Sequence, residues 1–285
     1  MAVAEALQAA STALRRNPII VGIVLVLSLL QLPTQFAQVA GPVFSAAVGA
    51  LFSVAMLVAA PFLFGGLLGM AAEALDGTTS FRTFVETGKQ HYLSMLGAYL
   101  LLIGAFIAVG FVASLASLAI VSALGILSGG LSSSTSPMFL AMFLVGTGVF
   151  VLVLLVPVFF VQFYGQAIVL DGASAISAFK RSIGLVRRNL LSVFGYSVLV
   201  FAVGLVFGGL SSIPSTLLSL QATRVPISMP IPDIGLPVAM TLTVIANVAF
   251  GLLASLFLVF SVAFYRTLDA TGSTDNPPNT QGAVA

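Results

Sequence analysis

The sequence predicts an all-α, polytopic transmembrane bundle of six spans with additional amphipathic interfacial helices. Of its 285 residues, 59% are hydrophobic and only 6% are charged, whereas soluble domains carry about 25% charged residues. Long stretches lack any charged residue, and the basic residues gather at the junctions between them. Because so few charges could not keep a soluble fold of this size in solution, we expect lipid to surround much of the chain.

Four windows without Asp, Glu, Lys or Arg are long enough for six membrane-crossing helices. They cover residues 17–72, 90–170, 189–223 and 234–265. A bilayer core of about 30 Å needs roughly 20 apolar residues per helix. The first two windows can therefore each hold two spans, with turn signals at 33–42 and 128–137. The expected spans are 18–38, 43–72, 93–127, 138–168, 190–218 and 238–265.

The distribution of basic residues predicts the orientation. With six spans, nine of the ten Lys and Arg residues lie on the side of both termini, and only Arg224 lies on the other. By the positive-inside rule, both termini of this multi-pass protein are expected in the cytoplasm, with the spans in the cell membrane. The competing interpretation is a signal peptide formed by Arg15, Arg16 and the apolar run after them. No small-x-small cleavage site follows, and three glutamines lie between residues 31 and 38.

A recurring acidic motif suggests a threefold internal repeat. Leu-Asp-Gly occurs at 75–77 and at 170–172, and Leu-Asp at 268–269. The aspartates, Asp76, Asp171 and Asp269, are 95 and 98 residues apart. We interpret 1–76, 77–171 and 172–269 as three parallel units, each an interfacial segment followed by two spans; the alternative is chance similarity among apolar segments. Residues 1–268 form a single transmembrane domain, and a disordered cytoplasmic tail is expected at 270–285.

Residues 173–189 form the clearest interfacial segment. At 100° per residue, one face is apolar, with Ile176, Phe179, Ile183, Val186 and Leu190. Another face is basic, with Lys180, Arg181, Arg187 and Arg188. This pattern predicts an in-plane helix at the membrane surface, capped at its N-terminus by Asp171 or Ser174. Weaker versions are expected at 2–16 and 80–92.

The basic residues of these segments are the candidate lipid-binding or partner-binding residues. They are Lys180, Arg181, Arg187, Arg188, Arg15 and Arg16. Cations near an anionic membrane surface attract phospholipid headgroups. The alternative, which we favour from sequence alone, is that these charges only fix the topology and anchor the helix.

Polar residues inside the spans are few. Gln162 and Gln166 share one face of the fourth span, and Asn247 lies in the sixth. They could line a cavity, but we expect them to bond to neighbouring helices. No Asp, Glu, Lys, Arg or His lies deep in a span, although transporters and pumps commonly place such residues there.

No residue pattern indicates an enzyme. The chain has no cysteine and a single histidine, His91, and no lysine follows its glycine clusters in the way a phosphate-binding loop requires. We therefore expect no catalytic residue, metal or cofactor. The net charge of +2 is too small to indicate a nucleic-acid partner.

Residues 167–189, AIVLDGASAISAFKRSIGLVRRN, resemble a signature of uncharacterised prokaryotic six-helix membrane proteins, including haloarchaeal ones. They also resemble the membrane domain attached to some glycerophosphodiester phosphodiesterases. Phe179 and Arg188 replace the Leu and Gly usual in that signature. The resemblance implies a fold and carries no activity, since the chain contains no phosphodiesterase domain.

Two functions stay open. The first is non-enzymatic organisation of lipids or partner proteins at the cytoplasmic face of the membrane, through the basic segments. The second is a transporter or channel for a neutral or apolar solute, with a cavity near Gln162, Gln166 and Asn247. A membrane-embedded enzyme would need a catalytic group that the sequence does not offer.

Overall fold

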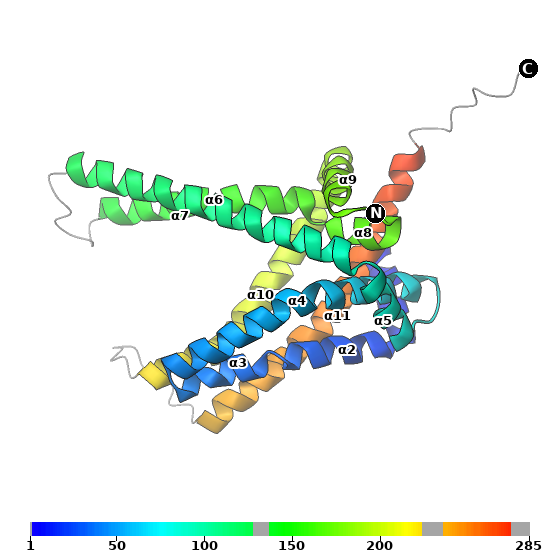
Figure 1. Ribbon diagram of the computed structural model, residues 1–285, viewed down its shortest axis with the longest axis horizontal. Coiled ribbons are helices and arrows are strands. Elements are labelled where there is room, and N and C mark those ends of the chain that lie inside the picture. Colours follow the sequence, from blue (N-terminus) through cyan, green and yellow to red (C-terminus); the bar gives the residue numbers. More distant parts are fainter. Residues whose placement is uncertain (1, 128–136, 224–235, 275–285) are drawn as a thin grey trace, which may run out of the picture.

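The computed structural model describes residues 2–127, 137–223 and 236–274, and every regular element in them is a helix. The expected loop at 128–137 lies almost wholly outside the described residues. The helices, shown in Figure 1, are α1 (Ala2–Arg16), α2 (Pro18–Leu29), α3 (Leu32–Phe36), η1 (Ala37–Ala40), α4 (Pro42–Asp76), α5 (Phe81–Gln90), α6 (Tyr92–Leu127), α7 (Pro137–Val161), α8 (Tyr164–Asp171), α9 (Ala175–Arg188), α10 (Leu190–Thr223) and α11 (Leu236–Thr274).

Five helical stretches of the described chain are long and apolar enough to cross a membrane. They are Pro18–Ala40, Pro42–Asp76, Tyr92–Ser117, Gly146–Asp171 and Leu236–Ala270. Helix α9 and the first half of α10 pass the same test only as a pair, and they meet at an angle of 104°. The expected all-α class with several membrane-length helices is therefore confirmed, and the number of such helices is five, or six if the bent pair counts as one.

The first expected span, 18–38, is not one continuous helix. Helix α2 ends at Leu29, and the shorter α3 and η1 carry the chain on to Ala40. The turn into the next helix comes at Gly41, whose φ of 112° lies in a region that favours glycine. Pro42 then begins α4, where the missing N–H of proline costs no hydrogen bond.

Helix α11 corrects the expected start of the tail. Disorder was expected from residue 270, but α11 continues to Thr274. The guanidinium of Arg181 on α9 binds the Asp269 carboxylate at 3.2 Å, and this contact holds the last turns of α11 against the rest of the protein. Residues 275–285 lie outside the described residues.

The helices form two groups that meet at one end of the molecule (Figure 1). Helices α6 and α7 run side by side and extend away as a hairpin, which we call the arm. Helices α2, α3, α4, α10 and α11 form the second group, which we call the bundle. The short helices α5, α8 and α9 lie where the arm meets the bundle. We call this meeting point the polar end.

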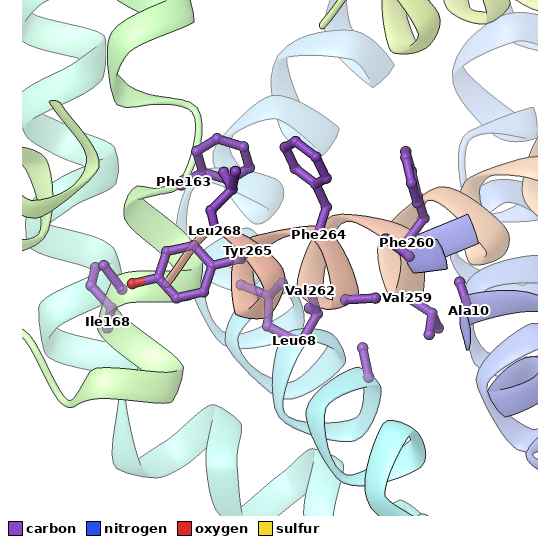
Figure 2. Packing of buried hydrophobic residues seen from close by; sticks show 14 of the residues in the cluster. Ala10, Leu68, Phe163, Ile168, Val259, Phe260, Val262, Phe264, Tyr265 and Leu268 are labelled. Atoms are coloured by element: carbon purple, nitrogen blue, oxygen red, sulfur yellow. The ribbon is translucent and has the colours of Figure 1, made fainter. Parts of the chain in front are cut away.

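The buried core lies at the polar end and is built around α11 (Figure 2). Phe260, Phe264 and Tyr265 of α11 are at most 1% exposed. Tyr196 of α10 stacks on Phe264, with ring centroids 4.6 Å apart, and Phe163 packs against both rings. Towards the other end, large apolar side chains are exposed on the arm and on the bundle, as expected where lipid replaces water as the solvent.

Helices α4 and α5 cross closely because glycines line the contact. A Cβ atom on Gly66 would lie 2.5 Å from the backbone oxygen of Phe84, and one on Gly69 would lie 2.4 Å from Thr87 Cγ2. From the other side, a Cβ on Gly88 of α5 would lie 2.8 Å from the Phe62 ring. Small residues let helix backbones approach in this way without a hydrophobic driving force.

Replacing one of these glycines should therefore separate the two helices. We expect Gly66→Ala to lower the free energy of unfolding by about 1–3 kcal/mol, because the new methyl group meets backbone that cannot rotate away. The matched control is Gly49→Ala on the same helix, where a Cβ has nothing within 4 Å. Thermal unfolding followed by circular dichroism in detergent micelles compares the two, and equal melting temperatures would contradict the crossing described here.

Candidate functional site

The charged groups of the polar end centre on the three aspartates of the repeat motif. Asp76 is the last residue of α4, Asp171 is the last residue of α8, and Asp269 lies near the end of α11. Although these residues are about a hundred positions apart in sequence, each carboxylate is bound by a side chain from another element. The structure thus brings them into one region, where they hold the ends of long helices together.

Arg181 of α9 joins two of these aspartates. Its Nε lies 2.5 Å from Asp171 Oδ2, and its Nη2 lies 3.2 Å from Asp269 Oδ1. The same Nε donates to the hydroxyl oxygen of Tyr265 at 3.1 Å, and that hydroxyl donates to Asp171. Since the Asp171 side chain is only 20% exposed, this cluster is partly shielded from solvent, and its charge-assisted bonds are of the stronger kind.

Arg266, the next residue of α11, binds the third aspartate. Its Nη1 and Nη2 donate to the two carboxylate oxygens of Asp76 at 2.7 and 3.0 Å, and Nη2 also donates to the Ala72 carbonyl at 3.1 Å. This fork-to-fork geometry suits a guanidinium and fixes direction as well as distance. Two consecutive residues of α11 therefore hold the ends of α8 and α4.

Asn17 links the α1–α2 junction to the connection after α4. The side chain is 2% exposed. Its Nδ2 donates to the carbonyls of Ala13 and Gly77 at 2.9 and 3.0 Å, and its Oδ1 accepts from the Thr79 backbone N–H at 2.7 Å. Sequence reasoning missed this role, although the Arg-Arg-Asn triplet before α2 and again before α10 was a signal that the asparagine matters.

Asn189 occupies the corresponding junction between α9 and α10. Its Nδ2 donates to the Leu185 carbonyl at 3.1 Å, as Asn17 does to the carbonyl four residues before it. In both places the amide adds a second hydrogen bond to a carbonyl that already accepts the backbone N–H of the same asparagine, and so reinforces the end of a short helix.

The six candidate basic residues do not act as one group. Arg181 is engaged by Asp171 and Asp269. The other five, Lys180, Arg187, Arg188, Arg15 and Arg16, are exposed. Among the described residues, none of these five forms an ion pair within 4 Å. Their charges are therefore available to groups outside the chain.

Helix α9 packs on the protein through a face next to the predicted apolar one, and the predicted apolar face stays partly exposed. Ala178, Ser182, Leu185 and Val186 are buried. Of the expected apolar face, only Val186 is buried, whereas Ile176 and Leu190 are 61% and 49% exposed. Small side chains at 178 and 182 allow α9 to approach α8 and the end of α7 closely, and this approach decides which face turns inward.

The structure corrects the expected caps of α9. Ser174 is the N-cap residue, but its side chain makes no capping bond to the backbone; its hydroxyl contacts that of Ser177 at 2.8 Å. The Asp171 carboxylate is bound by Arg181 and Tyr265 instead. The partly shielded cation attracts the carboxylate more strongly than exposed backbone N–H groups, which water can satisfy.

The polar residues of the spans bond to other helices, as expected. Gln162 and Ser197 of α10 exchange hydrogen bonds of 3.1 and 3.2 Å, and Gln166 Nε2 donates to Ser261 of α11 at 3.2 Å. Asn247 and Gln35 pair through their amides at 3.3 Å. Gln166 Oε1 is buried without a partner in the described structure.

Two surface hollows occur away from these amides. One lies between α1 and the end of α4 and includes Glu5 and Arg16; the other lies beside Gly41 at the start of α4. Neither is lined by Gln162, Gln166 or Asn247. Within the described ranges, no three His, Asp or Glu residues are grouped as a metal site would require.

His91 and Arg82 lie outside the membrane-length helices, and the pKa of each is shifted. Burial lowers the pKa of His91, which sits between α5 and α6, because it disfavours the charged imidazolium. The Glu86 carboxylate, 2.6 Å away, raises the pKa of Arg82 on the exposed surface of α5. Among the described residues, neither group is hydrogen-bonded to Asp76, Asp171 or Asp269.

The model of one protein family, described as a domain of unknown function (DUF7847), matches residues 1–268. The chain belongs to this family. The matched region includes α1, α5, α9 and the residues Tyr265 and Arg266, so most of the polar end falls within the family's domain; Asp269 is the first residue after it. No curated protein and no solved structure matches the chain.

The Asp171 cluster should behave as a coupled unit. We expect Asp171→Asn and Tyr265→Phe each to destabilise the protein. The double variant should lose less stability than the sum of the two single losses, with a coupling free energy of about 0.5–3 kcal/mol, because both changes remove the same hydrogen bond. Thermal or denaturant unfolding in micelles measures the cycle. The control pairs Tyr265→Phe with Glu86→Gln, and these two effects should add; additivity in the Asp171 cycle would contradict the geometry.

Proposed function

We propose that this protein is a six-span integral membrane protein whose polar end faces the cytoplasm and binds anionic phospholipid headgroups through α9. Lys180, Arg187 and Arg188 carry this role, with Arg15 and Arg16 of α1 as a second group. The protein acts by organising lipid around a fixed bundle, without catalysis. The observation that carries the proposal is the exposed, unpaired state of these five cations beside the ion-paired Arg181.

The three-sided character of α9 supports an in-plane position at the membrane surface. Using 100° per residue, the buried face centred on Ala178 and Leu185 is followed by an exposed apolar side and then by a basic side. Ile176 and Leu190 belong to the apolar side, and Arg187 to the basic side. A helix at the interface meets three environments, namely protein, acyl chains and headgroups, and α9 offers one side to each.

The bend between α9 and α10 supports six spans. If α10 crosses the bilayer, the angle of 104° lays α9 roughly parallel to the membrane surface. The same reading places α1 and α5 at that surface, each directly before a membrane-length stretch. Three units of one interfacial helix and two spans follow, and the resemblance to six-helix prokaryotic membrane proteins agrees with this arrangement.

The alternative function, a transporter or channel for a neutral or apolar solute, has less support. Gln162, Gln166 and Asn247 bond to other helices, so most of their polar atoms are not available to a solute. The unpartnered Gln166 Oε1 is one buried acceptor, which a single water molecule could satisfy.

The topology can be tested directly because the chain contains no cysteine. Single substitutions Thr78→Cys and Ser177→Cys place a thiol at the polar end, and Ala40→Cys places one near Gly41 at the opposite end. All three positions are exposed on the protein surface. We expect a membrane-impermeant maleimide to label Ala40→Cys in intact cells, and the other two only after permeabilisation. Labelling of all three from outside would contradict the proposed orientation.

The lipid role predicts a specific loss of affinity. We expect Arg187→Gln with Arg188→Gln to weaken binding of phosphatidylglycerol by roughly 30-fold, since each cation near an anionic surface contributes about 1 kcal/mol. The measurement is titration of labelled phosphatidylglycerol onto purified protein in neutral detergent, at low and high salt.

The matched control removes two exposed cations of α5, through Arg82→Gln with Lys89→Gln. This control should keep more of the affinity, because Arg82 is already paired with Glu86. If both variants lost the same affinity for phosphatidylglycerol, binding would depend on total surface charge, and a specific role of α9 would be contradicted. No loss in either would contradict the proposed function.

A further inference from the structure

The last span before α9 is interrupted, and a serine from α9 sits in the interruption. Helix α7 ends at Val161 and α8 begins at Tyr164. Ser182 Oγ accepts a hydrogen bond from the Phe163 backbone N–H at 3.2 Å and donates to the Phe160 carbonyl at 2.9 Å. The Ser182 side chain is fully buried. One hydroxyl thus replaces the backbone bonds that a continuous helix would make there.

The neighbouring glutamine completes the interruption. Gln162 Nε2 donates to the Phe159 carbonyl at 3.0 Å, and the same amide exchanges bonds with Ser197 of α10. Backbone groups left unpaired in a lipid environment are costly, so these two side chains are what allows the helix to break at this depth. Pro157 lies four residues before the end of α7 and already lacks an N–H for the preceding turn.

Burial changes abruptly across this break. On the α8 side, Gln166, Ala167 and Ile168 are buried. On the α7 side, apolar residues pointing in every direction around the helix are exposed, namely Val151, Leu152, Val153, Leu155, Val156 and Val158. Helix α8 is therefore part of the core, whereas α7 leaves it and makes few contacts beyond α6 and α9 (Figure 1).

Helix α6, the other helix of the arm, is attached in a similar way. Helix α5 ends at Gln90, His91 forms a turn, and α6 begins at Tyr92. Met95 and Ala98 near its start are buried, and Tyr92 donates to the Val58 carbonyl at 3.1 Å. Further along, Leu101, Ile107 and Phe111 are exposed. Among the described side chains, both helices of the arm are thus buried near the polar end, each next to an interruption of the helix.

We propose that the α6–α7 arm is hinged at residues 162–163 and 91, and that Ser182 sets its angle to the bundle. Ser182 belongs to α9, in the middle of the basic helix. A small displacement of α9 changes the two bonds at the hinge, while the long arm multiplies the movement at its far end. Building on the proposed function, anionic headgroups that draw α9 towards the membrane surface would alter the position of the arm.

The absence of native cysteine permits a distance measurement at defined positions. Spin labels at Thr147→Cys on α7 and Ser53→Cys on α4 report the separation of arm and bundle, since both positions are exposed. A reference pair, Ser53→Cys and Thr241→Cys, reports on α4 and α11 within the bundle. Double electron–electron resonance in nanodiscs of phosphatidylcholine gives the distance distribution for each pair.

We expect Ser182→Ala to shift and broaden the arm-to-bundle distribution and to leave the reference pair unchanged. Ser182→Thr, which keeps a hydroxyl, should largely preserve the original distribution. Ser177→Ala, at an exposed serine of the same helix, should preserve it fully. An unchanged arm-to-bundle distance in Ser182→Ala overturns the proposal. Broadening of both pairs also overturns it, because Ser182 would then support the whole fold and not the hinge.

A second comparison separates the hinge from lipid binding. In nanodiscs containing phosphatidylglycerol, the arm-to-bundle distance of the native chain should differ from its value in phosphatidylcholine. The variant with Arg187→Gln and Arg188→Gln should show the same distance in both lipids. If the Ser182→Ala effect is present but lipid shifts nothing, the hinge stands and the coupling to headgroups is rejected. If the charge variant responds to lipid like the native chain, α9 is not the element that senses headgroups.

Discussion

The polar end depends on the last turns of α11, whose side chains bind the ends of α4 and α8 and the middle of α9. Tyr265 and Arg266 are adjacent in sequence, yet they point to the ends of α8 and α4. Asp269, one turn later, receives Arg181 from α9. Since the aromatic core is built on the preceding turns of the same helix (Figure 2), packing and ion pairing strengthen one another. The buried rings fix the position of α11, and this position brings Tyr265 to Asp171 of α8 and Asp269 to Arg181 of α9.

The proposed membrane position accounts for this arrangement. In lipid, apolar contacts between helices bring no hydrophobic gain, so long helices are held by close packing and by polar bonds. The described chain places its close packing at glycines of α4 and its charged pairs at the polar end. Towards the other end, the Gln35–Asn247 pair is one of the few interhelical polar contacts. Exposed Phe111, Val156 and their neighbours need no protein partner when acyl chains surround them.

The sequence predicted most helices and few of their contacts. Charge-free windows locate α4, α6 and α11 because a bilayer imposes a minimum length on an apolar run. The motif spacing also singled out Asp76, Asp171 and Asp269. Their partners could not be predicted, since the pairing of Asp76 with Arg266 spans 190 residues and leaves no local pattern. The face of α9 that packs on the protein could not be predicted either: hydrophobicity alone favours Ile176 for burial, whereas close helix approach favours Ala178 and Ser182.

The distinction between Arg181 and its basic neighbours explains how one helix can serve both structure and binding. Arg181 lies next to the buried face of α9 and is held by carboxylates and a tyrosine, so its charge is already compensated. Arg187 and Arg188 lie at the C-terminal end, where the helix dipole favours cations, and within the described ranges no carboxylate forms an ion pair with them. Under the proposed function, an anionic headgroup meets this uncompensated charge at that end of α9. The buried Ser182, between these two regions, is where a force on the exposed end reaches the interrupted span.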